Sequence, residues 1–175
     1  MSSHTNDIIS LDCAILTVSD TRTAGDDTSG NLLAENVAQA GHVCAKREIV
    51  RDDIYQIRRV ISDWIANPHI QVILTSGGTG FSHKDSVPEA IRPLFDKEID
   101  GFGELFRQLS FTDIGSSAIQ SRALAGYANH TVVFCMPGST SACQMAWTHI
   151  IREQLDSRYK PCNFATHLHR ARTAA

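Results

Sequence analysis

Long hydrophobic runs are missing from this chain of 175 residues. No apolar stretch approaches the roughly 20 residues that a membrane-spanning helix needs. The polar start, residues 1–7, has neither the charged nor the apolar region of a signal peptide. A large charge excess is missing as well, because 16 basic and 19 acidic residues leave a formal net charge of −3. The sequence therefore predicts no overall basic field for nucleic acids or membranes, and any anion has to be bound by local geometry.

Paired cysteines are also missing. The five cysteines are odd in number, form no C-x-x-C motif, and in several cases lie inside apolar runs, which predicts buried, reduced thiols in a cytoplasmic protein. The length is typical of a single domain with a sizeable core, and neither an internal repeat nor a linker divides the chain. We predict a domain at residues 12–164, preceded by a loose arm at 1–11 and followed by a tail at 165–175.

Short apolar segments typical of buried strands alternate with amphipathic segments typical of helices. The predicted strands are Cys13–Val18, His42–Val50, Ile70–Leu74 and Thr131–Met136. Helices are predicted in the intervals between these strands, with a short one after Gly101 and a last one that reaches about Leu155. Residues 110–130 show no clear pattern, and the chain from Lys160 onward is expected to be irregular. This alternation predicts an α/β fold with a mostly parallel sheet covered on both faces.

Several polar residues stand where helices are expected to begin. Thr28 or Ser29 can cap the first helix, and Gly41 fits the end of that helix. Either Asp52 or Asp53 can start the second helix. Residues 86–89, Ser-Val-Pro-Glu, have the pattern of a capping box with proline in the first turn.

The most informative segment is Thr75–Gly80, which reads Thr-Ser-Gly-Gly-Thr-Gly and is followed by Asp85. It stands between a predicted strand and a predicted helix. Glycines let the backbone adopt positive φ and approach a ligand closely, so that successive N–H groups can converge on a phosphate. Asp85 adds a carboxylate where a metal-bound phosphate would need one. The spacing is neither that of a Walker A loop nor that of a dinucleotide-binding loop, and a tight turn without a ligand is the alternative.

Four polar loops follow predicted strands. They are residues 19–29, 51–53, 76–85 and 137–141, and all are rich in Asp, Ser, Thr or Gly. In a parallel sheet such loops meet at the carboxyl edge, which is where ligands bind in open α/β folds. The sequence therefore predicts one crevice with several contributing loops.

The chain resembles the MoaB/MogA family of molybdenum cofactor biosynthesis proteins. The resemblance is carried by residues 16–20 (LTVSD), 26–30 (DDTSG), the 75–80 loop with Asp85, 101–104 (GFGE) and 136–139 (MPGS). It spans residues 12–164. Residues 106–111 (FRQLSF) and 158–164 (RYKPCNF) are more similar to the MoaB branch than to MogA.

The resemblance implies a three-layer α/β/α domain that assembles into a homo-oligomer, a trimer or a hexamer. It also implies binding of molybdopterin, a phosphorylated pterin dithiolene. Active members of the family use Mg²⁺ and ATP as co-substrate to transfer AMP to the molybdopterin phosphate, with release of pyrophosphate. Other proteins of the molybdenum cofactor pathway are possible partners.

Two acidic residues match the positions that the family associates with catalysis and with Mg²⁺, namely Asp52 and Asp85. The alternative for Asp52 is a helix N-cap, and Asp85 could equally cap the helix at Ser86. The binding residues implied by the resemblance are Ser19, Asp27, Ser29, Gly30, Ser76, Gly77, Gly78, Thr79, Gly80, Pro137, Gly138 and Ser139. Asp27 could instead only order its loop, and Pro137–Ser139 could be a plain turn. At a helix N-terminus this turn would favour anions.

One departure from the family pattern concerns a cation. Ser141 stands where related sequences often carry Lys, and Arg22, Lys84 or Arg122 could replace that charge.

Two functions therefore remain. The first is a molybdopterin adenylyltransferase, which the Asp52 and Asp85 pair favours. The second is a non-catalytic molybdopterin-binding or assembly protein, which the MoaB-like tail and Ser141 favour.

Overall fold

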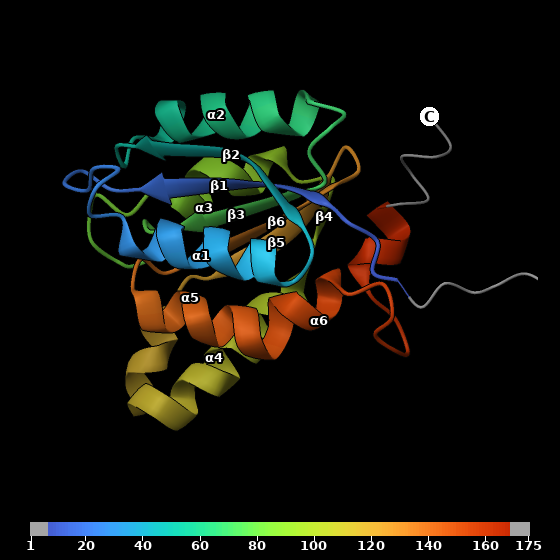
Figure 1. The fold of residues 1–175 in the computed structure, drawn as a ribbon. Helices are drawn as coiled ribbons and strands as arrows, with labels where there is room; N and C mark the ends of the chain where they lie inside the picture. Colours follow the sequence, from blue (N-terminus) through green and yellow to red (C-terminus); the bar gives the residue numbers. More distant parts are fainter. Residues whose placement is uncertain (1–6, 169–175) are drawn as a thin grey trace, which may run out of the picture.

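Residues 7–168 are described by the computed structural model. A six-stranded sheet with the order β2-β1-β3-β6-β5-β4 forms its centre (Figure 1). The strands are β1 (Asp12–Val18), β2 (Val43–Val50), β3 (Val72–Ser76), β4 (Lys97–Glu98), β5 (Leu124–Ala128) and β6 (Thr131–Met136). β2, β1, β3 and β6 run parallel, whereas β5 pairs antiparallel with both of its neighbours. The prediction of a mostly parallel sheet is thus confirmed.

Helices cover both faces of the sheet. They are α1 (Thr28–Gln39), α2 (Ile54–Ala66), α3 (Val87–Ile91), α4 (Asp100–Ile114), α5 (Thr140–Ala146) and α6 (Arg152–Leu155). A π-helical turn, η3 (Trp147–Ile151), joins α5 to α6, and the short 3-10 helices η1 (Arg92–Leu94) and η2 (Gly115–Gln120) follow α3 and α4. Figure 1 shows α2 over one face and α1, α4 and α5 on the other. The expected three-layer arrangement is therefore present.

Side-chain alternation along the strands divides the core into two halves. Ile15, Leu74 and Phe134 point toward α1, α4 and α5, whereas the intervening residues Leu16 and Ile73 point toward α2 and α3. This two-residue period is what a sheet buried on both faces requires. None of the helices within residues 7–168 is long and apolar enough to cross a membrane.

Four of the six strands were predicted from the sequence, one of them at a shifted position, and two strands were missed. β6 has the predicted bounds, but β3 runs two residues later than expected, so that Ser76 is its last residue. The omitted strands are β4 and β5. β5 gives a weak signal because it contains small residues, and the Phe95 ring packs so closely on Gly126 that a Cβ there would lie 2.2 Å from the ring. The helix after Gly101 is also longer than predicted, since α4 spans 15 residues.

Helix starts differ from the predictions at two places. Asp27, not Thr28 or Ser29, caps α1 by accepting a hydrogen bond from the Gly30 N–H. Asp53 caps α2, which decides between the two aspartates. Ser86 is the N-cap of α3 but forms no capping box: its side chain accepts no cap hydrogen bond, and its hydroxyl donates to Asp52.

The predicted irregular tail is wrong between Phe164 and Leu168. These residues are helical, and Ala165 and Leu168 are buried in the core. The Phe164 ring also lies edge-on to Phe134. Residues 1–6 of the predicted arm and 169–175 of the predicted tail lie outside the described residues.

All five cysteines are free thiols, as predicted. Three of them are buried, and burial raises the pKa of Cys135 and of Cys143 to about 12. Cys162 departs from the prediction because it is exposed.

Candidate functional site

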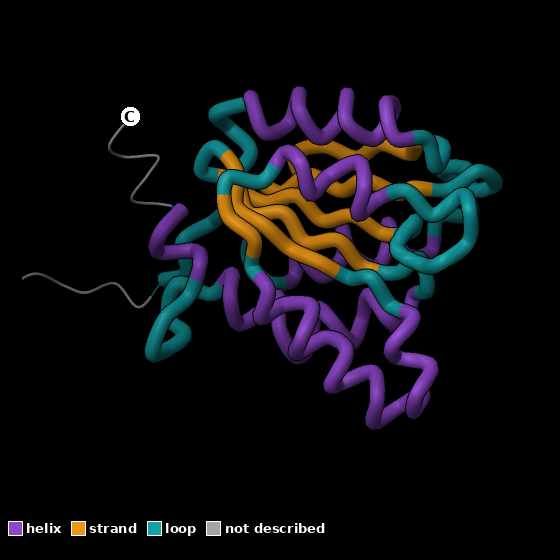
Figure 2. Tube along the Cα trace, turned by 180° about the vertical axis from the view of Figure 1, so that it is seen from behind, coloured by secondary structure: helices purple, strands orange, loops and turns teal. Residues whose placement is uncertain are grey.

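The glycine loop, defined as residues 76–86, lies where β3 ends. Figure 2 shows this end of the sheet, where loops from several strands gather on the right (Figure 2). Gly77 has φ of 100° and Gly78 has φ of 68°, a region that L side chains rarely adopt. A Cβ on Gly77 would lie only 2.1 Å from the Val18 carbonyl oxygen of β1. The two glycines are therefore required by conformation and, at Gly77, by space.

Asp52 reaches the glycine loop from the end of β2. Its Oδ1 accepts hydrogen bonds from the Ser86 backbone N at 3.0 Å and from the Ser86 hydroxyl at 2.5 Å. The Asp52 backbone N donates to Asp20 Oδ1 at 3.2 Å. Because Asp53 is the helix cap, the N-cap alternative for Asp52 is wrong.

Electrostatics at Asp52 oppose its ionisation. Burial raises the pKa of this half-buried carboxyl, the two Ser86 hydrogen bonds lower it, and the negative charges of Asp85 and Asp20 raise it again. The net result is a pKa above the usual value. A cation or a proton at this place would relieve the repulsion.

Asp85 belongs to the glycine loop itself and directly precedes Ser86. Its Oδ2 accepts a hydrogen bond from the Ser82 N–H at 2.8 Å, so the carboxylate orders the loop and does not cap α3. A Cβ on Gly80 would lie 2.8 Å from Asp85 Oδ2, and a Cβ on Gly78 would lie 2.7 Å from Asp52 Oδ2. Both predicted catalytic carboxylates therefore lie against the glycines.

The loop after β1, residues 19–29, contains residues that line a cavity and residues that are buried beneath it. Ser19 belongs to the rim of a cavity of about 630 Å³, and its hydroxyl accepts from the Arg22 N–H. Asp27 is only 1% exposed; it accepts from the Gly30 N–H and the Thr17 hydroxyl and pairs with Arg47 at 3.3 Å. Both of its carboxylate oxygens are thus engaged, which supports the alternative that Asp27 orders its loop.

Ser29 connects the loop after β1 with the loop after β6. It is buried and donates a hydrogen bond to the Gly138 carbonyl at 2.8 Å. Gly138 in turn packs on Gly77, where a Cβ on Gly138 would lie 3.3 Å from the Gly77 Cα. Ser139 caps α5 by accepting from the Ala142 N–H, so Pro137–Ser139 does precede a helix N-terminus. The loops predicted to converge therefore do converge.

Two hydroxyl residues of the glycine loop are buried. Thr79 is 2% exposed and Ser76 is 1% exposed. The Ser76 hydroxyl has no hydrogen-bond partner within the described part of the chain. Since buried polar groups are nearly always paired, Ser76 is an exception at the start of the glycine loop.

The three cations proposed to replace a lysine at Ser141 all have protein partners. Lys84 pairs with Asp20 at 3.0 Å, and Arg22 donates to the Thr28 hydroxyl at 2.8 Å. Arg122 donates to two carbonyls of the glycine loop. The Lys84 side chain is exposed, whereas Arg122 is three-quarters buried against the glycine loop.

Sequence reasoning missed two participants in this site. Ser86 was assigned to a capping box, and its bond to Asp52 spans 34 residues of sequence. Asp20 follows β1 directly, and a carboxylate at this carboxyl edge of the sheet is a sequence signal for its place beside Asp52. Arg122 was considered only as a phosphate-binding cation.

The fold and the site together define an α/β protein whose polar strand-end loops meet at the carboxyl edge of the sheet, where two carboxylates lie against a glycine loop. Residues 14–157 match the family described as "Probable molybdopterin binding domain". The chain belongs to this family.

Relatives span nearly the whole chain. Molybdenum cofactor biosynthesis protein B of Escherichia coli K12 is 52% identical over 168 residues, which are 96% of this chain and 99% of that protein. The protein of the same name from Bacillus subtilis is 46% identical over 144 residues, 82% of this chain and 85% of that protein.

Solved structures agree. A crystal structure of a molybdenum cofactor biosynthesis protein B has a TM-score of 0.86 at 43% identity and covers 93% of this chain and 98% of its own. The tungsten cofactor synthesizing protein MoaB from Pyrococcus furiosus has a TM-score of 0.78 at 32% identity, with coverage of 93% and 98%. The resemblance to the MoaB/MogA family that the motifs indicated is thus confirmed.

Proposed function

We propose that this protein binds molybdopterin and adenylylates its phosphate with Mg-ATP. The observation that carries the proposal is the placement of two carboxylates against the glycines of one loop, Asp52 beside Gly78 and Asp85 beside Gly80. Family membership supports the ligand, since the matched domain is described as probably molybdopterin-binding. Both substrates are anions, which agrees with a site built from backbone N–H groups and a helix N-terminus.

The two carboxylates fit Mg²⁺. This ion commonly uses one or two carboxylates together with phosphate oxygens and water. Burial raises the pKa of Asp52, and the charges of Asp85 and Asp20 raise it further. Asp52 and Asp85 would hold the ion, and the ion would neutralise phosphate charge. Within residues 7–168 no group of three or more His, Cys, Asp or Glu side chains is placed to hold a metal by itself. The nucleotide phosphates would therefore complete the coordination.

The remaining residues would bind and orient the substrates. In the transfer, a molybdopterin phosphate oxygen bonds to the α-phosphorus of ATP while the bond to the pyrophosphate oxygen breaks. The attacking and leaving oxygens have to stand in line. N–H groups of the glycine loop can fix one phosphate, and the Ser139 end of α5 offers a second set of N–H groups.

A non-catalytic molybdopterin-binding or assembly protein is the second candidate. It is favoured by Asp52, whose Oδ1 already accepts two hydrogen bonds from Ser86 and thereby holds the loop. Ser141 favours it as well, because the three neighbouring cations are engaged with protein groups. In this case the crevice would bind the pterin phosphate without turnover.

Incubation with Mg-ATP and molybdopterin separates the two functions. We expect AMP-molybdopterin and pyrophosphate to form, and Asp85→Asn to lower the rate at least about a hundredfold, since removal of one transition-state charge interaction commonly costs that much. Thermal unfolding of the variant serves as the control for folding. Pterin binding without AMP transfer by the wild-type protein would establish the second candidate, and full activity of Asp85→Asn would remove Asp85 from the reaction.

Two further properties belong to the proposal. We propose that the chain assembles into a homo-oligomer, a trimer or a hexamer, and works with other proteins of the cofactor pathway. We also propose a cytoplasmic location, which the five free cysteines support.

A further inference from the structure

Arg122 binds the glycine loop at two places, in its middle at Thr79 and Gly80 and near its end at Asp85. Its backbone N donates to the Thr79 carbonyl at 2.9 Å, and its Nε donates to the Gly80 carbonyl at 2.8 Å. Its Nη2 donates to the Asp85 carbonyl at 2.8 Å, and its Nη1 forms an ion pair with Glu89 of α3. The residue lies between η2 and β5 and is a quarter exposed.

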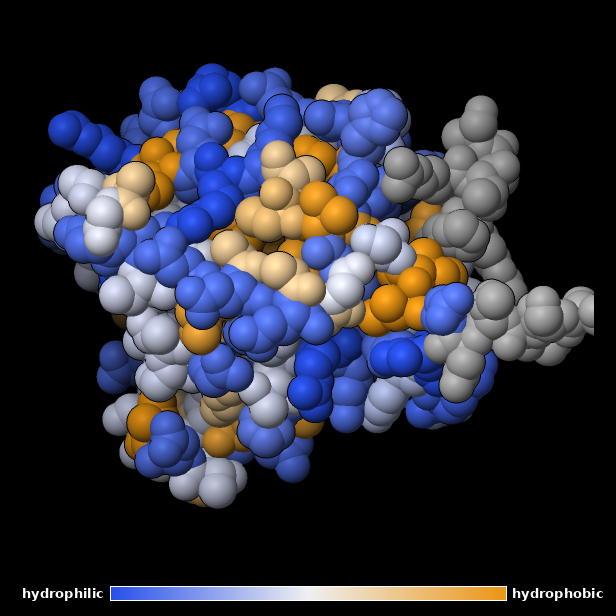
Figure 3. All heavy atoms as spheres, in the orientation of Figure 1, coloured by the Kyte–Doolittle hydropathy of each residue, from blue (hydrophilic) through white to orange (hydrophobic). Residues whose placement is uncertain are grey.

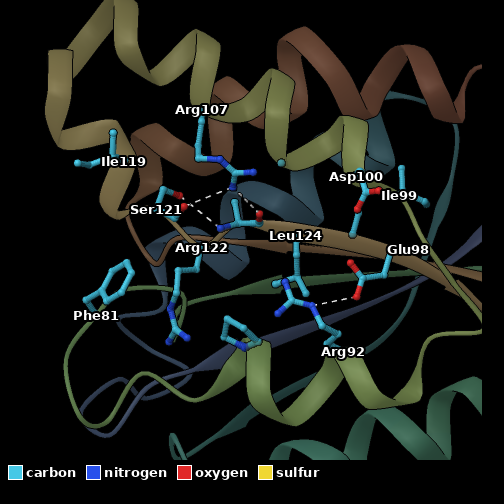
Figure 4. A pocket seen from close by; sticks show the side chains of 14 residues that line it. Phe81, Arg92, Glu98, Ile99, Asp100, Arg107, Ile119, Ser121, Arg122 and Leu124 are labelled. Atoms are coloured by element: carbon cyan, nitrogen blue, oxygen red, sulfur yellow. Dashed lines mark hydrogen bonds and ion pairs between the residues drawn. The ribbon is translucent and has the colours of Figure 1, made fainter.

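The guanidinium therefore fixes the distance between Gly80 and Asp85. Residues 81–84 between them are exposed, and their other restraints include the hydrogen bonds between Ser82 and Asp85 and the ion pair of Lys84 with Asp20. The planar fork of arginine can bind two carbonyls at once, which a lysine cannot do with the same geometry. Phe81 covers the guanidinium, with its ring centroid 5.3 Å away. Figure 4 shows both side chains at the edge of a pocket of about 320 Å³ behind the loop (Figure 4).

One peptide links Arg122 to Asp52. In a trans peptide the C=O and N–H groups point in opposite directions. The peptide between Asp85 and Ser86 uses its C=O to accept from Arg122 and its N–H to donate to Asp52 Oδ1. Arg122 thus aims the donor that holds the Asp52 carboxylate, although it touches neither candidate catalytic side chain.

We propose that Arg122 is a positioning residue that holds residues 79–86 in the conformation in which Asp52 and Asp85 flank the glycines. Its effect on the loop is independent of the proposed function, whereas its effect on ligand binding depends on that function. This assignment replaces the idea that Arg122 supplies a cation directly to a phosphate, because three of its N–H groups are turned toward the loop and α3.

Arg58 provides a matched control. It is also half-buried and donates from its guanidinium to two carbonyls, those of Ala90 at 3.1 Å and Glu89 at 2.9 Å. Both carbonyls lie in α3, beyond the glycine loop. Arg58→Ala removes the same chemistry next to the loop without touching residues 79–86.

Hydrogen–deuterium exchange of the full chain without ligand tests the proposal. In Arg122→Ala we expect amides of residues 79–86 to exchange at least about tenfold faster, because hydrogen bonds from a charged donor are lost. Strands β1, β3 and β6 should exchange as in the wild type. Arg122→Lys should give an intermediate rate, and millimolar guanidinium ion should slow the exchange of Arg122→Ala alone. Unchanged loop exchange in Arg122→Ala, or an equal increase in Arg58→Ala, would overturn the proposal.

Mg-ATP binding provides the second measurement. If the wild type binds Mg-ATP, we expect about tenfold weaker binding by Arg122→Ala and unchanged binding by Arg58→Ala. Unchanged affinity of Arg122→Ala would contradict a positioning role. If the wild type does not bind Mg-ATP, the proposed function fails, and the exchange rates alone decide the role of Arg122. Should Arg122→Ala fail to fold, Arg122→Lys serves in both measurements.

Discussion

At the scale of single residues, Asp52 has two roles: it holds the glycine loop, and in the proposed function it binds Mg²⁺. It holds Ser86 through two hydrogen bonds and stands against Gly78. Its raised pKa means that folding disfavours the ionised form. Stability from this group is therefore complete below the unfolded-state pKa of about 4 and is lost as the pH rises through the folded-state pKa.

Asp52→Asn removes this titration but keeps an oxygen that can accept from Ser86. We expect the variant to gain free energy of unfolding relative to the wild type as the pH is raised from about 4 toward neutrality. Ser86→Ala should have the opposite effect, because loss of the hydroxyl donor raises the pKa of Asp52 further. Urea unfolding at several pH values measures both. If Asp52→Asn and the wild type show parallel pH profiles, burial does not disfavour the Asp52 charge.

At the scale of elements, the turn from β3 into the glycine loop depends on its close approach to β1. Gly77→Ala would place a methyl group 2.1 Å from the Val18 carbonyl at a φ of 100°. We expect a loss of more than about 2 kcal/mol in the free energy of unfolding, since strain at such a φ and steric overlap both contribute. Urea unfolding followed by circular dichroism measures this loss.

Gly101→Ala is the matched control. Gly101 lies in the first turn of α4, and a Cβ there would meet no atom within 4 Å. This substitution should be neutral or stabilising by up to about 1 kcal/mol, because alanine loses less entropy in a helix. Equal stabilities of the two variants would mean that the glycine loop can move away from β1.

The helices and strands were more predictable than the site. A strand is encoded by a pattern within a few neighbouring residues, whereas the site depends on contacts between residues far apart in the sequence. Buried runs such as Thr131–Met136 carry their pattern within a few residues, and strand-end loops follow from parallel topology. The bond between Asp52 and Ser86 connects residues 34 positions apart, and no local pattern encodes it. β5 was missed because Gly126 makes room for Phe95 of another segment. Ser86 misled because its position fits a capping box in sequence, whereas in space its hydroxyl donates to the Asp52 carboxylate.

At the scale of the whole molecule, apolar side chains remain exposed at the outer end of α4 and on η2. Phe111 is 61% exposed, Ile114 55% and Ile119 77%. Figure 3 shows apolar atoms at the lower left, over this part of the molecule (Figure 3). Clustered exposed apolar residues commonly mark protein interfaces. We infer that these three side chains contact a second copy of the chain in the proposed homo-oligomer.

Phe111→Glu combined with Ile119→Glu tests this interface. Charges placed in an apolar contact have to be desolvated without partners, so we expect light scattering to show a multiple of the 19.2 kDa chain for the wild type and the single chain for the double variant. Tyr55→Glu is the control, because Tyr55 is 74% exposed on α2, in the opposite layer. It should leave the mass unchanged. A monomeric wild type would refute the oligomer. A double variant that keeps the wild-type mass would place the interface elsewhere, on a surface that does not include the end of α4.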